Sequence, residues 1–294
     1  MKYAFLILAH TDPHQLRRLV HALDDPRFDV FIHVDAKSDI SSFQFETYTL
    51  QYSHLHVLKH RYKVLWGDIS IVDATLAMYR QAMEFDRYDR FITLSGLDYP
   101  IQSNDVIAST LSDPDVEFIM GNIITKVEYQ KVERYHFWKL RKFRRIAILL
   151  LGMFRIKKPR YLIVGNQIWD IYSAPQWHAL SFECVRHIFE TLETYPQIKE
   201  YFKYSYAPDE LLIPTIVFNT PSLRKRALRD SFPEHAHYNE KTAIHHINYD
   251  PIIEVFTASK FQVIMESGKL FFRKARTGVS DQLLDMIDET RNVR

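Results

Sequence analysis

Glu210 is the acidic residue with the most informative setting in this 294-residue sequence. It follows Pro208 and Asp209 and precedes an apolar run over residues 211–217, so we expect it at a helix start, where proline and acidic residues are favourable. A carboxylate held rigidly beside buried residues suits a general base. An acid that only complements the helix dipole would have the same setting, so both interpretations stay open.

Two cations, Arg273 and Lys274, directly follow the apolar run Leu270–Phe272. Cations at the end of a buried strand face either a phosphate group in a cleft or bulk water, and the pattern does not separate the two. Parallel α/β sheets bind ligands beyond the carboxyl ends of their strands. Three further polar positions follow apolar runs in this way: His10, Asp35 and the turn Ser95–Asp98.

Several familiar catalytic patterns are absent from the sequence. It has no G-x-S-x-G, H-E-x-x-H, Walker A or G-x-G-x-x-G motif. Asp113 and Asp115 have the D-x-D spacing, but they flank Pro114 in a polar turn and do not end an apolar strand. None of the 14 histidines matches a zinc-site spacing, so we interpret them as structural and surface residues and do not expect a metal site.

The elements that must position these residues begin with alternating strands and helices. Tyr3–Ala9 is a continuous apolar run typical of a buried parallel strand, and helical periodicity follows before a second strand at Phe28–Val34. Strand, helix and strand in this order predict an α/β fold with a mostly parallel central sheet. Residues 1–120 are predicted to form a nucleotide-binding half, with further strands at 54–58, 90–95 and 116–120 and a helix over 70–83.

The second half of the chain is less regular. Its predicted elements are a strand at Tyr161–Val164, a helix from about Pro175 to Leu192, and helix starts capped by Thr257 and Ser280. No repeat or low-complexity linker interrupts the chain. We therefore expect a single domain over residues 1–294, with an acceptor and catalytic half over 121–275 and a C-terminal helix within 276–294.

The composition excludes several classes of protein. With 47% hydrophobic and 25% charged residues, the chain has the proportions of a folded globular protein and not of a disordered one. Seven glycines leave little room for a Gly-rich phosphate loop. The single cysteine, Cys184, excludes an internal disulfide and a cysteine-based zinc site.

The net charge of +2 hides a strongly basic segment. Residues 139–160 carry nine basic side chains and no acid, so the rest of the chain carries about −7. The apolar run Ile146–Phe154 within this segment is shorter than the roughly 20 residues that span a bilayer. The pattern suits an element in the interface of an anionic membrane, although a buried element with solvated basic flanks is the alternative. Its basic residues flank the apolar run, so nucleic acid is not an expected partner.

Seven segments together resemble the core-2/I-branching β-1,6-N-acetylglucosaminyltransferase and peptide O-xylosyltransferase family, which is glycosyltransferase family 14. They occur in family order over nearly the whole chain, and the blocks H-V-D-x-K, S-G-x-D-Y-P-I and P-D-E are specific in combination. The segments are Leu6–His10, Phe31–Lys37, Val64–Gly67, Phe91–Ile101, Gly165–Gln167, Tyr206–Glu210 and Leu270–Lys274.

The resemblance implies a GT-A-type, Rossmann-like glycosyltransferase fold without a D-x-D motif, and a reaction that needs no divalent metal or other cofactor. It implies inverting transfer from a UDP-sugar to an acceptor hydroxyl, with Glu210 as catalytic base, Lys274 at the diphosphate, and His10 and Asp35 in the uridine pocket. The family's second diphosphate cation, an upstream arginine, has no counterpart near Pro251. Three residues stay open for that role: Arg273, His246 and Lys241.

The residues that contact the acceptor are predicted less directly than those that bind the donor. The resemblance places Glu133 and Arg134 in a charged acceptor-side stretch, to which we also assign Asp98. Trp169 has the chemistry to stack on a sugar ring, although each of these residues could equally be a packing residue. The resemblance favours N-acetylglucosamine as the donor sugar and xylose next. A non-catalytic sugar- or lipid-binding module on a degenerate transferase fold is the alternative from another class.

The expected acceptor is a glycan or a lipid-linked oligosaccharide of a cell-surface polysaccharide or lipopolysaccharide. Animal members of the family carry an N-terminal membrane anchor and many disulfides, and this sequence has neither. We therefore expect a bacterial, cytoplasmic enzyme that binds peripherally to the inner membrane through residues 139–160.

Overall fold

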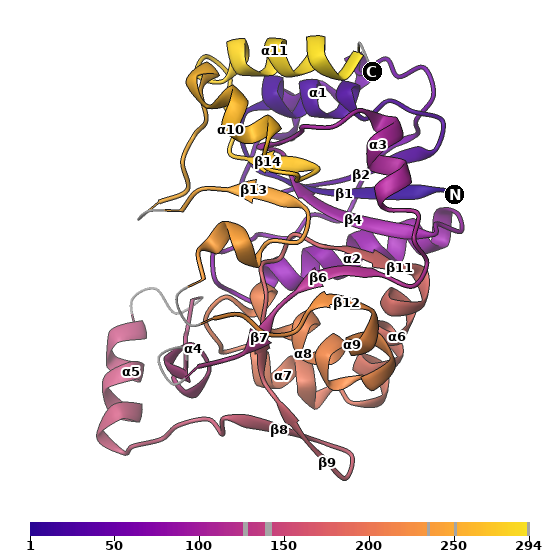
Figure 1. Cartoon of the computed structure of the whole chain (residues 1–294). Coiled ribbons are helices and arrows are strands. Elements are labelled where there is room, and N and C mark those ends of the chain that lie inside the picture. The colour runs from indigo at the N-terminus through magenta and orange to yellow at the C-terminus, as the bar shows by residue number, and fades with distance from the viewer. Residues whose placement is uncertain (126–128, 139–142, 234–235, 250–251, 293–294) are drawn as a thin grey trace.

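A computed structural model describes residues 1–125, 129–138, 143–233, 236–249 and 252–292 (Figure 1). Residues 139–142 of the basic segment and Pro251 lie outside these ranges. The strands are β1 (Tyr3–Ala9), β2 (Phe28–Val34), β3 (Leu55–Val57), β4 (Arg90–Ser95), β5 (Asp98–Pro100), β6 (Glu117–Met120), β7 (Asn122–Ile123), β8 (Tyr161–Val164), β9 (Gln167–Asp170), β10 (Tyr172–Ser173), β11 (Ala179–Ser181), β12 (Ala227–Arg229), β13 (His245–Ile247) and β14 (Phe271–Arg273).

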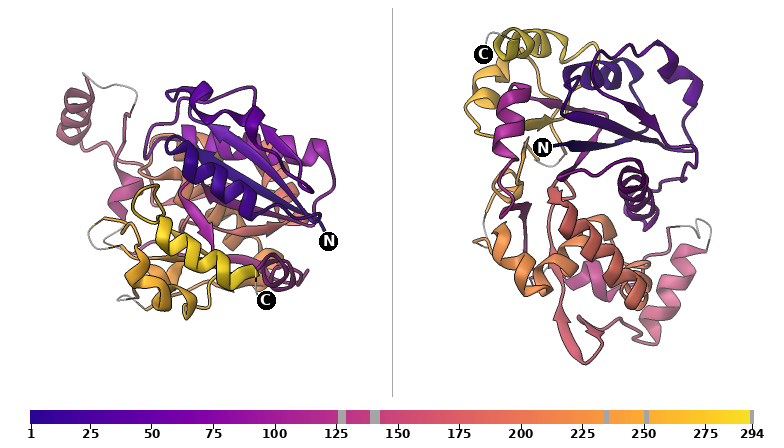
Figure 2. Two further views of the ribbon diagram at one scale, coloured as in Figure 1. Left: turned by 90° about the horizontal axis from the view of Figure 1, so that it is seen from above. Right: turned by 90° about the vertical axis from the view of Figure 1, so that its right-hand side faces the viewer.

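Helices cover both faces of the central sheet, as the two views of Figure 2 show. No described helix is long and apolar enough to cross a membrane. The helices are α1 (Pro13–Ala22), α2 (Ser70–Phe85), α3 (Asn104–Thr110), α4 (Tyr129–Glu133), α5 (Arg144–Met153), α6 (Phe182–Thr194), α7 (Gln197–Phe202), α8 (Leu212–Asn219), α9 (Pro221–Arg226), α10 (Phe261–Met265) and α11 (Asp281–Asn292).

The central sheet has seven strands in the order β12-β6-β11-β4-β1-β2-β3. Four of its six strand pairs are parallel, which confirms the predicted α/β class with a mostly parallel sheet. Alternate residues of β1 enter different cores: Ala4 and Leu6 pack with α2, α6 and α8, whereas Phe5 and Ile7 pack with α1, α3 and α11. Both faces of the strand are buried, which explains its unbroken apolar run.

Two strands of this sheet, β11 and β12, were not predicted. β11 lies between β4 and β6 and is antiparallel to both, so the first 120 residues do not complete the sheet by themselves. The helix expected from Pro175 begins only at Phe182, because residues 179–181 pair with β4 first. The Ser181 hydroxyl accepts a hydrogen bond from the Cys184 amide and caps α6. Strand pairing across the chain overrides local helical periodicity here.

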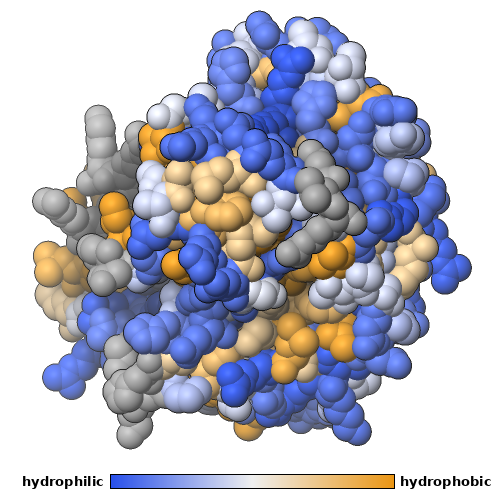
Figure 3. Space-filling model, turned by 45° about the horizontal axis from the view of Figure 1, so that its top comes forward, coloured by the Kyte–Doolittle hydropathy of each residue, from blue (hydrophilic) through white to orange (hydrophobic). Residues whose placement is uncertain are grey.

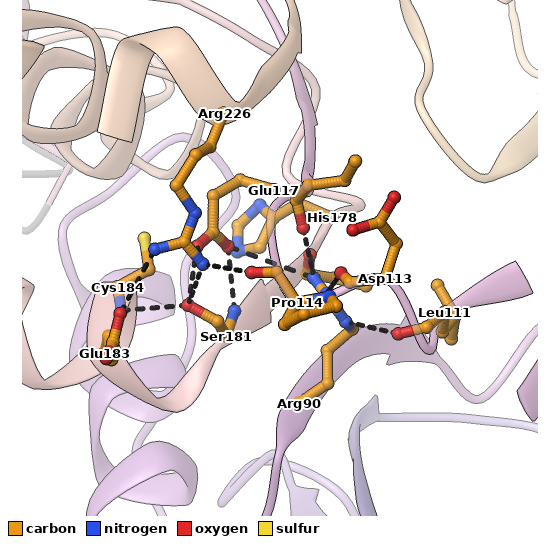
Figure 4. A network of polar contacts seen from close by, with 12 residues as sticks. Arg90, Leu111, Asp113, Pro114, Glu117, His178, Ser181, Glu183, Cys184 and Arg226 are labelled. Carbon is orange, nitrogen blue, oxygen red and sulfur yellow. Dashed lines mark hydrogen bonds and ion pairs between the residues drawn. The ribbon is translucent and has the colours of Figure 1, made fainter. Parts of the chain in front are cut away.

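A buried carboxylate holds this antiparallel part of the sheet together (Figure 4). Glu117 in β6 is fully buried and accepts hydrogen bonds from the Ser181 amide at 2.8 Å and the Ser181 hydroxyl at 2.5 Å. It also pairs with Arg226 of α9 at 3.0 Å and lies 3.9 Å from the Arg90 guanidinium of β4. One side chain therefore connects β4, β6, the start of α6 and the end of α9.

A smaller sheet brings distant segments to the carboxyl end of β4. Its order is β13-β14-β5, with β13 parallel and β5 antiparallel to β14. Thr257 and Ser280 do directly precede helical elements as predicted, but neither hydroxyl bonds an amide of the element that follows. The Thr257 hydroxyl bonds to Ser259 and caps no amide of the short turn that follows. The Ser280 hydroxyl donates to the Phe256 carbonyl at 2.7 Å and so ties the start of α11 to this sheet.

The basic and apolar segment lies at the opposite end of the molecule from α11, where α5 projects from the body and β8 and β9 form a hairpin (Figure 1). The predicted strand Tyr161–Val164 is confirmed as β8. Gly165 at the hairpin turn has a φ of +58°, a conformation that glycine adopts readily.

Glu117→Ala should lower the free energy of unfolding by about 3–5 kcal/mol, because it leaves the buried Arg90 guanidinium without a counter-charge and removes the buried hydrogen bonds of Ser181. Glu183→Ala is the matched control, since exposed Glu183 also pairs with Arg226 and its removal should change the free energy by less than about 0.5 kcal/mol. Urea unfolding of both variants measures the difference. Equal effects would contradict the role given to Glu117.

Candidate functional site

Polar residues that follow the central strands gather at one edge of the sheet. His10 follows β1, Asp35 follows β2, and Arg273 ends β14 just before Lys274. Burial on the inner side of His10 lowers its pKa, the charges of Arg273 and Lys274 lower it further, and Asp35 opposes them. These mutual effects place the four predicted residues in one cluster.

Asp35 is the buried acid of this cluster. Its carboxylate accepts a hydrogen bond from the Lys37 amide at 2.9 Å and pairs with the Lys37 ammonium at 3.2 Å. Its own amide donates to the Ala9 carbonyl at the end of β1. The two strand ends are therefore joined directly, and the edge that a ligand would meet is well ordered.

Asp98 is the buried hub on the other side of the cluster. Its carboxylate accepts hydrogen bonds from the Ser95 amide at 2.7 Å and from the Arg273 guanidinium at 2.8 Å, and it lies 3.1 Å from Nε2 of His245. Burial by itself would raise the pKa of Asp98, but the charge of Arg273, with His245, holds it below its ordinary value. Asp98 was expected to contact the acceptor. It is fully buried and positions Arg273 instead, which corrects that expectation.

Arg273 and Lys274 form a pair of adjacent cations. The Arg273 guanidinium is stacked over the Trp177 ring, 4.9 Å from its centroid. Burial, followed by the charges of Arg273 and Arg276, lowers the pKa of Lys274, whose ammonium has no ion pair among the described residues. Two cations share one buried carboxylate, so the cluster keeps a net positive charge that suits an anion.

The other two candidates for the second cation lie in β13, the strand paired with β14, and in the turn before it. His246 is in β13, and burial, followed by the charge of Lys269, lowers its pKa, so it carries no charge near neutral pH. It lines a cavity of about 370 Å³ together with Tyr238 and Glu254. Lys241 ends the 3-10 turn Tyr238–Lys241.

Glu210 ends a 3-10 turn, Pro208–Glu210, that directly precedes α8. The expected helix start is thus one tight turn followed by an α-helix. The Glu210 carboxylate is partly exposed and lies 3.9 Å from the Lys131 ammonium. Asp209 faces inward, and its burial, followed by the charge of Glu210, raises the pKa of Asp209 to about 7. Both neighbouring acids are partly exposed, and Glu210 is the one that lies beside Lys131.

Tyr238 is influenced by the charges of both Glu210 and Arg273, and sequence analysis missed this residue. Burial raises the pKa of Tyr238, the charges of Glu210 and Asp209 raise it further, and the charge of Arg273 acts in the opposite direction. Both Glu210 and Arg273 are therefore within electrostatic range of the Tyr238 hydroxyl. No motif or strand end marks Tyr238 in the sequence, because its place depends on how the loop before β13 folds back.

The three other residues expected on the acceptor side differ in exposure, and two of them have the packing role that was the alternative. Glu133 is buried and forms ion pairs with Arg160 and with Lys157, so it anchors the basic segment. Arg134 is exposed. Trp169 is only 8% exposed and belongs to a hydrophobic core, so its ring has no open face for a sugar.

An exposed aromatic ring lies elsewhere, close to Glu210. Trp66 is 69% exposed and makes edge-to-face contacts with Trp138 and Tyr206, at centroid distances of 5.9 and 5.3 Å. Burial, followed by the charge of Glu210, raises the pKa of Tyr206, which places this aromatic group beside the acid. Gly67 is required next to it, because a Cβ there would meet the Trp138 ring at 2.7 Å and its φ is +75°.

The described residues offer positive charge at Arg273 and Lys274 and a partly exposed carboxylate at Glu210. Within the residues that the structure describes, no three His, Cys, Asp or Glu side chains come together as a metal site would need. The chemistry available from the described side chains is therefore anion binding by Arg273 and Lys274 and proton transfer by Glu210.

Comparison with known proteins gives consistent relatives. The family model described as Core-2/I-Branching enzyme matches residues 3–265. Xylosyltransferase 1 of Rattus norvegicus is 26% identical over 235 residues, which is 75% of this chain and 26% of that protein. Xylosyltransferase 2 of Homo sapiens is 22% identical over 311 residues, covering 98% of this chain and 33% of that protein. The chain thus spans about a quarter to a third of the length of these relatives.

Among solved structures, mouse xyloside xylosyltransferase 1 in its apo form aligns over 92% of this chain and 97% of its own. Its TM-score is 0.38 and its sequence identity is 11%, a likeness too low to argue from.

Asp98→Asn should lower the free energy of unfolding at pH 7 by about 3–5 kcal/mol, because Arg273 loses its buried counter-charge. The folded-state pKa of Asp98 is depressed, so its stabilisation is present above the ordinary carboxyl pKa and is lost as the pH falls through the folded value. The difference between wild type and variant should therefore narrow in acid. Urea unfolding between pH 7 and pH 3 tests this, with Asp105→Asn on the surface as control.

Proposed function

Because the chain belongs to the Core-2/I-branching enzyme family, we propose that it is an inverting glycosyltransferase that uses a UDP-sugar as donor. The single observation that carries the proposal is the pair of adjacent cations at the end of β14, in which Asp98 holds the Arg273 guanidinium at 2.8 Å, while Tyr238 senses the charges of both Arg273 and Glu210. This arrangement offers positive charge for a diphosphate leaving group and a carboxylate for an attacking hydroxyl.

Fixed cations are the means by which the leaving group is stabilised. Negative charge develops on the diphosphate as its bond to the sugar breaks, and preorganised positive groups stabilise that charge. Arg273 is held by Asp98 and Trp177, and it lies next to Lys274. We therefore assign the role of the second diphosphate cation to Arg273, in preference to His246 and Lys241. His10 and Asp35 are assigned to the uridine pocket.

Glu210 is assigned as the general base. In the proposed step, the acceptor oxygen forms a bond to the anomeric carbon while the bond from that carbon to the diphosphate oxygen breaks. The hydroxyl proton passes to Glu210, UDP leaves, and attack from the opposite side inverts the anomeric configuration. Lys131 lies close enough to influence the charge of Glu210, and the exposed Trp66 ring offers an acceptor sugar a surface to stack on.

The donor and acceptor are proposed more narrowly from the resemblance. We favour N-acetylglucosamine as the transferred sugar, in a β-1,6 linkage to a glycan or lipid-linked acceptor of a surface polysaccharide or lipopolysaccharide. Transfer of xylose is the alternative that the similarity to xylosyltransferases favours. A thermal-shift comparison of UDP-sugars separates these donors, because the sugar nucleotide that binds most tightly raises the melting temperature most.

Glu210→Gln should lower the transfer rate by about 10²–10⁴-fold, because the attacking hydroxyl loses its general base. Binding of UDP, measured by calorimetry, should stay within about twofold, since the cations are unchanged. Glu266→Gln, which changes an acid bonded to Gln262 on the surface, is the matched control and should keep full activity. Transfer at the wild-type rate by the Glu210 variant would remove this residue from the mechanism.

Lys274→Ala should weaken binding of UDP by about tenfold or more, because it removes half of the positive pair that faces the diphosphate. Lys260→Ala, which removes a lysine paired at the surface with Glu254, is the control for lysine loss. Transfer by the wild type should persist in EDTA, because fixed cations take the place of a metal in the proposed mechanism. Activity that disappears with EDTA and returns with magnesium would refute that mechanism.

A further inference from the structure

Large apolar side chains project at one end of the molecule, on α5, the following residues 154–160 and the β8–β9 hairpin. We call these three elements the docking face. Ile146, Leu149, Met153, Phe154, Ile163 and Ile168 are each more than half exposed. In Figure 1 and in the right-hand view of Figure 2 the three elements lie at the end away from α11. Hydrophobic side chains also project in Figure 3, at the left edge, where α5 lies in Figure 1.

The docking face is firmly attached to the body. Lys158 is buried, its amide donates to the Glu133 carbonyl, and its ammonium donates to the Tyr201 carbonyl at 3.0 Å and the Ser205 hydroxyl at 2.6 Å. Glu133 is also paired with Arg160. These bonds fix the segment where it leaves the body, so its apolar side chains are held outward and do not fold onto the core.

The exposed charged side chains around these apolar residues are positive. No acid occurs between residues 139 and 169, whereas Arg155, Lys157 and Arg160 are exposed. The buried Glu133 carboxylate faces both Lys157 and Arg160 and can offset only one of their charges. Apolar side chains among exposed cations match the two parts of an anionic bilayer surface, its acyl boundary and its headgroups.

We propose that the docking face binds peripherally to an anionic phospholipid bilayer. Isolated exposed apolar residues are common on proteins, but a group of this size marks an interaction surface. A second copy of the chain fits this surface less well, because self-association would bring the same cations together without added acids. The bilayer satisfies the apolar side chains and the positive charges at once.

The position of the docking face also bears on the acceptor, an extension that depends on the proposed transferase function. The helix α4 carries Glu133, which anchors the docking face, and Lys131, which lies 3.9 Å from Glu210. Membrane binding would therefore bring the assigned base close to the headgroup region. An acceptor that is linked to a lipid would reach Glu210 without leaving the bilayer.

Vesicle flotation of the full chain tests the proposal, with vesicles of phosphatidylcholine alone or mixed equally with phosphatidylglycerol. The wild type should float with the mixed vesicles, and high salt should weaken binding. The double variant Leu149→Asp, Phe154→Asp should bind at least about tenfold more weakly. It replaces two apolar side chains that the bilayer would bury with charges that anionic lipid repels. Val279→Asp, the same kind of change at a single exposed site outside the docking face, should bind like the wild type.

Two results would overturn the proposal: wild type that stays unbound with phosphatidylglycerol vesicles, or a double variant that floats like the wild type. Sedimentation equilibrium without lipid adds a third, a wild-type dimer that the double variant abolishes, which would assign the face to a second copy. Transfer to a water-soluble acceptor separates this proposal from the proposed function, since the double variant should keep that activity. Unchanged melting temperatures would establish that the variants are folded.

Discussion

The buried ion pair between Asp98 and Arg273 is the constraint on which the candidate site depends. Asp98 lies just beyond β4, and Arg273 comes from β14, far along the chain. Burial opposes ionisation of the acid, and only the nearby positive charge keeps its pKa below the ordinary value. Removing either partner would leave an uncompensated charge in the interior. The pair thus fixes where the two cations stand relative to the central sheet.

A second buried carboxylate plays the equivalent part on the other side of β4. Glu117 joins β6 to the start of α6 and to α9, and it allows β11 to enter the sheet between β4 and β6. That insertion brings the segment before β11 under the site, where Trp177 supports the Arg273 guanidinium. The network around Glu117 completes the central sheet, whereas the pair of Asp98 and Arg273 orients positive charge toward a ligand.

Sequence analysis identified well those residues whose structure depends on neighbours close in the sequence. β1 is an unbroken apolar run and β2 is mostly apolar, so both strands were predicted to the residue, and the polar positions after them followed from the topology of parallel sheets. The residues that it misjudged depend on long-range packing. Trp169 looks like a sugar platform in the sequence but packs into the core, and Glu133 looks like an acceptor contact but holds Arg160.

The sequence by itself determined the α/β class, the family, the cluster of His10, Asp35, Arg273 and Lys274 at the strand ends, and the basic apolar segment. Only the tertiary structure decided that Asp98 is a buried counter-ion, that Tyr238 comes within electrostatic range of both Glu210 and Arg273, and that α5 is held outward. The physical reason is that periodicity and strand ends are local properties, whereas burial and charge pairing depend on segments brought together from far along the chain.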